Sequence, residues 1–244
     1  MIALAGLLLA WFAVFGGHLL EGGHAGSLSN FPAALIVLGG TLAAGMIQAD
    51  AKTWKTAWTL FPSIFWQQRP GTDLAVGKLV LWCQLARRSG PLSLDPESSQ
   101  EPDTFLRLGL QLIVDGAERD KIQQGLQVAM ASREHEALRA ADFFEALGGY
   151  APTMGILGAV LGLIQLMTQV DDMHAIGVGI ATAFVATLYG VGLANLFFLP
   201  VAGRLRSDAL QRSQFEEMIS DGMLAILEGE NPRLLERRLR EYRL

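Results

Sequence analysis

The apolar stretches of this 244-residue chain carry few side chains that could take part in chemistry. Asp, Glu, Lys, Arg and His are missing from the middle of each stretch, and the remaining polar groups are hydroxyls and amides: Thr41, Thr153, Gln165, Thr182, Thr187, Tyr189 and Asn195. Ionisable side chains form the proton relays of membrane proteins, so this chain alone lacks the groups for one. Either its apolar part is structural, or a partner supplies the charged group.

Thr187 has the best position among these side chains for contact with an ion or a partner. It lies near the middle of its stretch, with Ala183 one helical turn before it and Val191 one turn after it. The alternative is structural, because a threonine in a membrane helix commonly donates its hydroxyl to a carbonyl of its own helix. The sequence leaves both interpretations open.

The stretches that position these side chains are residues 2–20, 31–49, 150–170 and 176–199. About 20 apolar residues span the hydrocarbon of a membrane, and 51% of the chain is hydrophobic while only 18% is charged. The first stretch has no basic residues before it, so we interpret it as a retained helix and not as a signal peptide. We therefore expect an all-α, polytopic membrane protein with four transmembrane helices.

The connections between the stretches predict the topology. The two short connections contain no Lys or Arg, whereas basic residues occur in the early half of the long middle segment and at the start of the tail. By the positive-inside rule, that segment, the tail and both termini are cytoplasmic. The expected domains are a first transmembrane hairpin (1–50), a helical cytoplasmic domain (51–147), a second hairpin (148–203) and a cytoplasmic tail (204–244).

Periodic apolar residues favour helices in the cytoplasmic parts as well. They predict helices over residues 73–90 and 104–116, and a third helix that runs from residue 118 almost directly into the third span. Residues 91–103 are rich in Pro, Ser and Asp and are predicted to form a loop. In the tail, Asn231 is expected to cap a helix that begins at Pro232.

Helix breakers and small residues are concentrated in the last two spans. Small residues recur there at spacings of three and four: Gly155, Gly158, Ala159, Gly162, Ala186, Gly190 and Ala194. Such residues let helix backbones approach closely in a membrane, so we expect helix packing within the chain or along an oligomer lining. Pro152 and Pro200 lie at the cytoplasmic ends of the same spans. Each is compatible with a helix start, and their shared depth suggests a hinge as the second interpretation.

Several function classes lack the residues that they need. The single cysteine, Cys83, excludes an intrachain disulfide and a cysteine-based metal site. The four histidines are scattered without ligand spacing, and no nucleophile and base stand together, so we expect neither an enzyme nor a metal or cofactor site. No dense Lys/Arg run is interleaved with aromatic residues, so no nucleic-acid partner is expected.

Residues 149–167 (GYAPTMGILGAVLGLIQLM) and 177–206 (GVGIATAFVATLYGVGLANLFFLPVAGRLR) resemble the last two membrane helices of the MotA/PomA flagellar stator subunits. SNFPAALIVLGGTLAAGMI resembles their second helix, LEGGHAGSL their first outer loop, and FLRLGLQLIVDG and AILEGENPRLLERRL their cytoplasmic segments. The resemblance covers nearly the whole chain. The more distant TolQ and ExbB energisers share the last two spans but usually have no first hairpin.

The resemblance implies an ion-driven torque generator in the bacterial inner membrane. In the family, copies of this subunit form a ring, expected to be pentameric and embedded in lipid, around a dimer of a MotB-type single-span protein. The ion-binding aspartate belongs to that partner, which agrees with the lack of carboxylates in these spans. The resemblance places Thr187 in the ion pathway beside that aspartate, and implies that Pro152 and Pro200 couple ion flow to cytoplasmic movement.

The resemblance also bears on the rotor contact and on the choice of ion. Family members contact the rotor protein FliG with an arginine and a glutamate eight residues later; Arg87 and Asp95 have this spacing, and Arg88 could share the basic role. The shorter Asp and the intervening proline depart from the family pattern, and a solvated charged loop is the alternative.

Sodium-type members add hydroxyls where this chain has Ala159 and Ala186. Because alanine offers no oxygen ligand, we expect protons.

Two other functions compete with this interpretation. A TolQ/ExbB-like energiser of an outer-envelope process would keep the proton channel but have another output. A membrane scaffold would conduct no ions. The first hairpin and the segment that carries Arg87 and Asp95 favour the flagellar function over the energiser.

Overall fold

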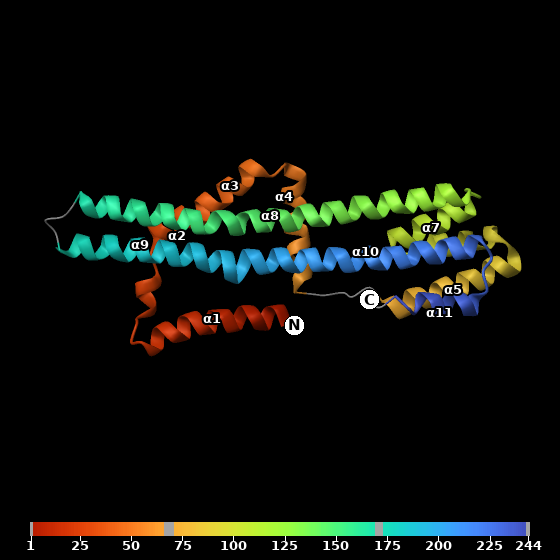
Figure 1. Ribbon diagram of the computed structural model, residues 1–244, viewed down its shortest axis with the longest axis horizontal. Coiled ribbons are helices and arrows are strands. Elements are labelled where there is room, and N and C mark those ends of the chain that lie inside the picture. The colour runs from red at the N-terminus through yellow and green to blue at the C-terminus, as the bar shows by residue number, and fades with distance from the viewer. Residues whose placement is uncertain (1, 66–70, 169–172, 243–244) are drawn as a thin grey trace. The chain divides into compact units, whose positions relative to one another are not determined.

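The computed structural model describes residues 2–65, 71–168 and 173–242. Within these ranges the chain is helical and contains no strand (Figure 1). The helices are α1 (Ile2–Leu20), α2 (Phe31–Ala34), α3 (Gly40–Gln48), α4 (Ala51–Leu60), α5 (Thr72–Ser89), α6 (Asp95–Gln100), α7 (Thr104–Val114), α8 (Arg119–Met167), α9 (Met173–Leu193), α10 (Leu199–Leu227) and α11 (Pro232–Leu239). π-Helical turns follow α2 (Leu35–Gly39) and α9 (Ala194–Phe198).

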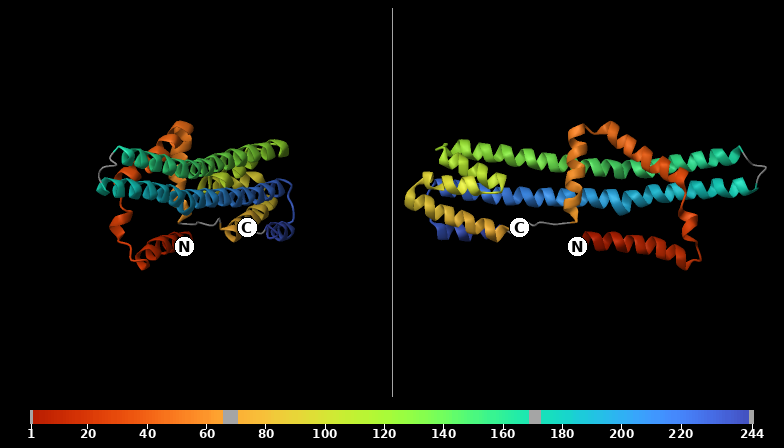
Figure 2. Two further views of the ribbon diagram at one scale, coloured as in Figure 1. Left: turned by 60° about the vertical axis from the view of Figure 1, so that its left-hand side comes forward. Right: turned by 180° about the vertical axis from the view of Figure 1, so that it is seen from behind.

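The chain divides into two compact units, and α8 and α10 contribute to both. Unit 1 comprises Met1–Gln67 and Ala137–Arg206, and unit 2 comprises Gln68–Glu136 and Ser207–Leu244. In unit 1, the part of α8 after residue 136 lies beside α9, as the views of Figures 1 and 2 agree. α2 and the π-turn after it contact α9.

Three stretches among the described residues are long and apolar enough to cross a membrane. They lie within Phe31–Gln48, Arg119–Met167 and Ile176–Leu227, and agree with the second, third and fourth predicted spans. The first predicted span folds as α1. Its apolar stretch Leu8–Leu20 is shorter than the three spanning stretches. The all-helical class is confirmed, while the count of four membrane helices stays a prediction.

Unit 2 is held together by large buried side chains. Its core contains Trp82, Phe105, Ile122, Met218 and Leu235, which come from α5, α7, α8, α10 and α11. α11 contacts α5, and the Cys83 thiol lies 3.3 Å from the Glu230 carbonyl oxygen. The predicted cap of α11 is confirmed, because Asn231 accepts a hydrogen bond from the Arg233 N–H.

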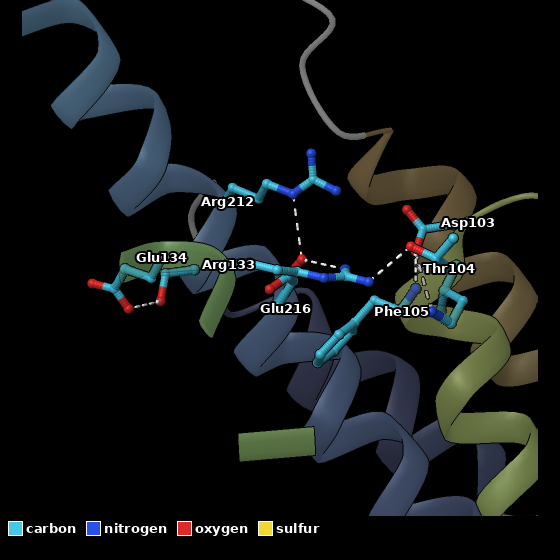
Figure 3. A network of polar contacts seen from close by, with 9 residues as sticks. Asp103, Thr104, Phe105, Arg133, Glu134, Arg212 and Glu216 are labelled. Atoms are coloured by element: carbon cyan, nitrogen blue, oxygen red, sulfur yellow. Dashed lines mark hydrogen bonds and ion pairs between the residues drawn. The ribbon is translucent and has the colours of Figure 1, made fainter. Parts of the chain in front are cut away.

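A buried carboxylate in unit 2 is compensated by two arginines (Figure 3). Glu216 is only 3% exposed and accepts hydrogen bonds from Arg133 (2.8 Å) and Arg212 (3.3 Å). Arg133 also donates to the Thr104 hydroxyl and lies over the Phe105 ring. A buried carboxylate needs such partners, so this network fixes the packing of α7, α8 and α10 in unit 2.

Two local predictions from the sequence are wrong. Residues 91–103 were predicted to be a loop, yet they contain a 3-10 turn (Pro91–Leu94) and α6. Proline is compatible with the first turn of a helix. Pro91 begins the 3-10 turn and Pro96 lies in the first turn of α6, while Leu94 is fully buried. The helix-start interpretation of Pro152 also fails, because α8 continues through that residue.

Candidate functional site

The contact between α8 and α9 is made by glycines that face backbone atoms. A Cβ on Gly190 would lie 2.5 Å from the Ala151 carbonyl oxygen, and one on Gly155 would lie 2.9 Å from the Ala186 carbonyl oxygen. Gly162 faces the backbone of α9 in the same way, and Gly158 faces the Ala186 methyl group. The structure therefore places these glycines in packing within the chain.

Thr187 projects from α9 on an exposed side, whereas Ala186 is fully buried. The Thr187 hydroxyl donates to the Ala183 carbonyl oxygen at 3.1 Å, which is the intrahelical bond considered as the structural alternative. A hydroxyl that donates one hydrogen bond keeps lone pairs that can accept another. The Thr187 hydroxyl can therefore still accept a hydrogen bond from a protonated group. Ala159 is half-buried on α8, one turn beyond Gly155.

A polar network joins the residues just before α2 to α9. The Asn30 amide donates to the Thr182 hydroxyl at 2.8 Å, and the Asn30 N–H donates to the Tyr189 hydroxyl at 3.3 Å. Tyr189 in turn donates to the Leu28 carbonyl oxygen, and Asn30 accepts from the Ala33 N–H as the cap of α2. Sequence analysis did not single out Asn30, although an Asn immediately before Phe-Pro is a cap signal.

The two prolines lie in different local structures. Pro152 is half-buried within α8, whereas Pro200 is exposed and follows the π-turn Ala194–Phe198. A proline inside a helix removes one backbone hydrogen bond and crowds the carbonyl four residues earlier. Both sites therefore lack one bond of the regular ladder, and near Pro200 the ladder is also shifted by the π-turn.

Ion pairs connect the helices of unit 1 near these prolines. Arg206 of α10 contacts Asp142 at 2.7 Å and Glu145 at 2.5 Å, both on α8. These two carboxylates raise the pKa of Arg206, so the guanidinium stays charged. Asp50 caps α4 through Thr53 and also contacts Arg139; the Thr53 hydrogen bonds, and the positive charge of Arg139, lower the pKa of Asp50.

The predicted rotor-contact residues lie on the surface of unit 2. Arg87 and Arg88 are in the last turn of α5, Asp95 begins α6, and all three are exposed. Gly90 ends α5 with φ +83° and turns the chain into the 3-10 turn between them. Leu92 in this turn is 75% exposed, an apolar side chain among charges that sequence analysis did not single out.

Within the described ranges, no group of three or more His, Cys, Asp or Glu side chains could hold a metal ion. Unit 1 instead offers polar contacts, closely packed backbones and helices that contain proline, and unit 2 separately offers exposed charges. This arrangement is suited to movement of helices and to contact with other chains.

Comparisons with known proteins extend over the full length. Residues 97–218 match the MotA/TolQ/ExbB proton channel family, and residues 4–90 match the Motility protein A N-terminal family. Motility protein A of Bacillus subtilis (strain 168) is 34% identical over 98% of this chain and 89% of its own length. Chemotaxis protein PomA of Vibrio alginolyticus is 30% identical over 96% of this chain and 92% of its own length.

Two solved structures are similar to this fold. The structure of C. jejuni MotAB has a TM-score of 0.93 at 27% identity and covers 98% of this chain and 94% of its own. The flagellar MotAB stator complex from Bacillus subtilis has a TM-score of 0.89 at 34% identity, and the match covers 99% of this chain and 96% of its own.

Proposed function

We infer the function from one premise, that this chain belongs to the MotA/TolQ/ExbB proton channel family. It is a flagellar motor stator subunit that, with a MotB-type partner, conducts protons across the membrane and converts the flow into torque. The observation that carries this conclusion is similarity over the whole chain. Residues 4–90, which include the first hairpin, match Motility protein A, and this match favours a motility protein over a TolQ/ExbB-like energiser.

We place the chain in the inner membrane with four spans, and with both termini and unit 2 in the cytoplasm. Support comes from the positions of Lys and Arg and from large apolar side chains exposed on the membrane helices, which suit lipid or neighbouring subunits: Phe12, Ile156, Leu157, Val160, Leu161, Val178, Phe184 and Leu188. We propose that α1 is the fourth membrane span, although its apolar stretch is shorter than the other three. A pentameric ring around a partner dimer completes the proposed assembly.

In the proposed mechanism the partner's aspartate takes up a proton beside Thr187. A neutral carboxyl tolerates the membrane interior far better than a carboxylate does, so protonation permits the ring to step past the partner. The membrane potential supplies about 2.3 kcal/mol per charge for each 100 mV. Protons are the proposed ion because neither Ala159 nor Ala186 offers an oxygen ligand to sodium.

Pro152 and Pro200 would transmit the step towards unit 2. The missing backbone bond at each proline lowers the resistance of its helix to bending, and the Arg206 contacts with Asp142 and Glu145 join the two helices just beyond the prolines. Movement of α8 would then be shared by α10.

The proposed rotor contact consists of Arg87, Arg88 and Asp95, facing opposite charges on FliG. Leu92 lies between these charges and is expected to add apolar contact. Apolar anchors inside a charged rim are typical of protein interfaces. If unit 2 delivers the torque, the surface formed by Arg87, Arg88, Asp95 and Leu92 must bind the rotor protein.

The decisive experiment reconstitutes this chain with its MotB-type partner in vesicles and measures proton uptake under an imposed potential. We expect uptake that disappears when the partner's membrane aspartate is replaced by asparagine. In a strain without other stator sets, deletion of the gene should abolish swimming and leave outer-envelope integrity intact. Proton uptake that persists without the aspartate would contradict the channel, and normal swimming would contradict the motor function.

A further inference from the structure

We propose that the network of Asn30, Thr182 and Tyr189 sets the rotation of α9 and thereby aims Thr187 at the ion pathway. The proposal rests on the proposed function, because Thr187 has its role only if protons pass beside it. Tyr189, Thr182 and Asn30 are then positioning residues that act on proton transfer through Thr187.

The network connects two elements that are distant in sequence. Asn30 precedes α2, while Thr182 and Tyr189 lie on α9, and both are bonded to Asn30. Tyr189 also bonds the Leu28 carbonyl oxygen, so α9 is tied to two residues of the same outer connection. Side chains on a helix lean towards its N-terminus, which in the proposed topology is the outer end of α9. This lean explains how Tyr189 reaches Asn30.

Thr187 and the network lie on opposite sides of α9. Thr182 and Tyr189 are seven residues apart and share a face, since seven residues complete almost two turns. Thr187 follows Thr182 by five residues, which places it roughly 140° around the helix. Tyr189 is half-buried and Thr187 is exposed, in agreement with this geometry. Fixing the Tyr189 side therefore fixes the direction of Thr187.

Close backbone packing constrains α9 on another side. Gly155, Gly162 and Gly190 meet backbone atoms there, and a larger rotation of α9 would bring a residue with a Cβ into the place of Gly190. The adjoining buried cluster, which shares Ala186 with the glycine contact, is formed by small or β-branched residues, Ala33, Val37, Val185 and Ala186. Hydrogen bonds between membrane helices are directional and have few competing partners in hydrocarbon. The Asn30 network thus adds directional bonds that favour one rotation of α9 within this close packing.

A double-mutant cycle tests this inference. The readout is proton uptake per assembled complex in vesicles, with the wild-type partner, so that loss of protein does not enter. Tyr189→Phe keeps the ring and removes only the hydroxyl. We expect it to lower uptake about threefold, the factor that corresponds to one hydrogen bond between membrane helices. In a Thr187→Ala background the same change should have no further effect, because its target is gone.

Tyr150→Phe is the matched control. It also removes a phenol hydroxyl of unit 1 that bonds across elements, to Gln48 at 3.0 Å, but at the cytoplasmic end. An equal loss of uptake in this control would overturn the inference, as would additive losses from Tyr189→Phe and Thr187→Ala.

A second pair of variants keeps the test informative if Tyr189→Phe does not assemble. Thr182→Ser retains the hydroxyl that accepts from Asn30, and Thr182→Val removes it. We expect uptake near wild type for the serine variant and a loss of about threefold for the valine variant; equal uptake in both would overturn the inference. If Thr187→Ala itself leaves uptake unchanged, the proposed pathway fails. If Thr187 matters but Tyr189 and Thr182 do not, only the inference fails.

Discussion

Two pairs of glycines, one pair in each unit, perform different tasks, and the difference separates two ways of packing helices. In unit 1, Gly190 and Gly155 allow α8 and α9 to approach backbone to backbone. In unit 2, Gly109 faces the Met223 side chain and Gly222 faces the Leu79 side chain. The glycine pair in unit 1 meets backbone atoms, which cannot move aside. The glycine pair in unit 2 meets flexible side chains, which can.

The reason lies in the surroundings that each unit must satisfy. Lipid is as apolar as a leucine side chain, so burial of large residues contributes little to association of membrane helices, and close backbones contribute instead. Outside the membrane, burial of apolar area supplies the main stabilisation. The Trp82 and Phe105 side chains, both 1% exposed, follow that second rule, in agreement with the proposed cytoplasmic position of unit 2. The same substitution should therefore have unequal effects in the two units.

The largest effect is expected for Gly190→Ala. The new methyl group would lie 2.5 Å from the Ala151 carbonyl oxygen and 3.0 Å from the Gly155 Cα, so α8 and α9 must separate. Overpacking of this kind destabilises by about 1–3 kcal/mol. We expect a lower melting temperature of the purified complex and loss of swimming.

Gly192→Ala is the control for this substitution. It changes the same residue type in the same helix, yet nothing lies within 4 Å of its new methyl group. Melting temperature and swimming should stay near wild type. Equal damage from both variants would show that the close α8–α9 contact at Gly190 is not the cause of the loss.

Sequence predicted the elements of unit 1 better than their contacts. Apolar length identified the later spans, and the spacing of Gly155, Gly162 and Gly190 indicated close packing. Periodicity could not decide whether that packing joins α8 to α9 or one chain to another, because the same small residues suit both. The backbone atoms opposite each glycine supply that information, and they depend on tertiary structure.

The polar network and the cytoplasmic elements show the limits of local patterns. Thr182 and Tyr189 were recognisable as polar groups in an apolar helix, but their shared partner, Asn30, is about 150 residues away in sequence. Residues 91–103 were misassigned because Pro and Ser indicate loops and also first turns of helices. Burial of Leu94 decides between these, and burial is not visible in composition.

A smaller effect is expected for Gly109→Ala in unit 2. The methyl group would lie 2.8 Å from the Met223 Cγ, and methionine has rotatable bonds that let it move. The adjustment should cost near the lower end of the about 1–3 kcal/mol that is typical of overpacking, offset by about 1 kcal/mol of improved helix propensity. The melting temperature should therefore change little, and swimming should persist. A loss as large as that of Gly190→Ala would remove the proposed distinction between the units.

The smallest effect concerns Cys83, the single cysteine, which reports on unit 2 alone. Its thiol is 1% exposed, and burial raises its pKa above the ordinary value of 9.0. A raised folded pKa favours the folded state below pH 9.0, and this contribution is lost as the pH rises through the folded value. At neutral pH the thiol should therefore react with a maleimide only when unit 2 opens. Gly109→Ala should change the labelling rate slightly, and Gly190→Ala should leave it unchanged, because that substitution disturbs only unit 1. Faster labelling in Gly190→Ala would show that strain at the α8–α9 contact reaches the unit 2 core. The two units would then not respond independently to these substitutions.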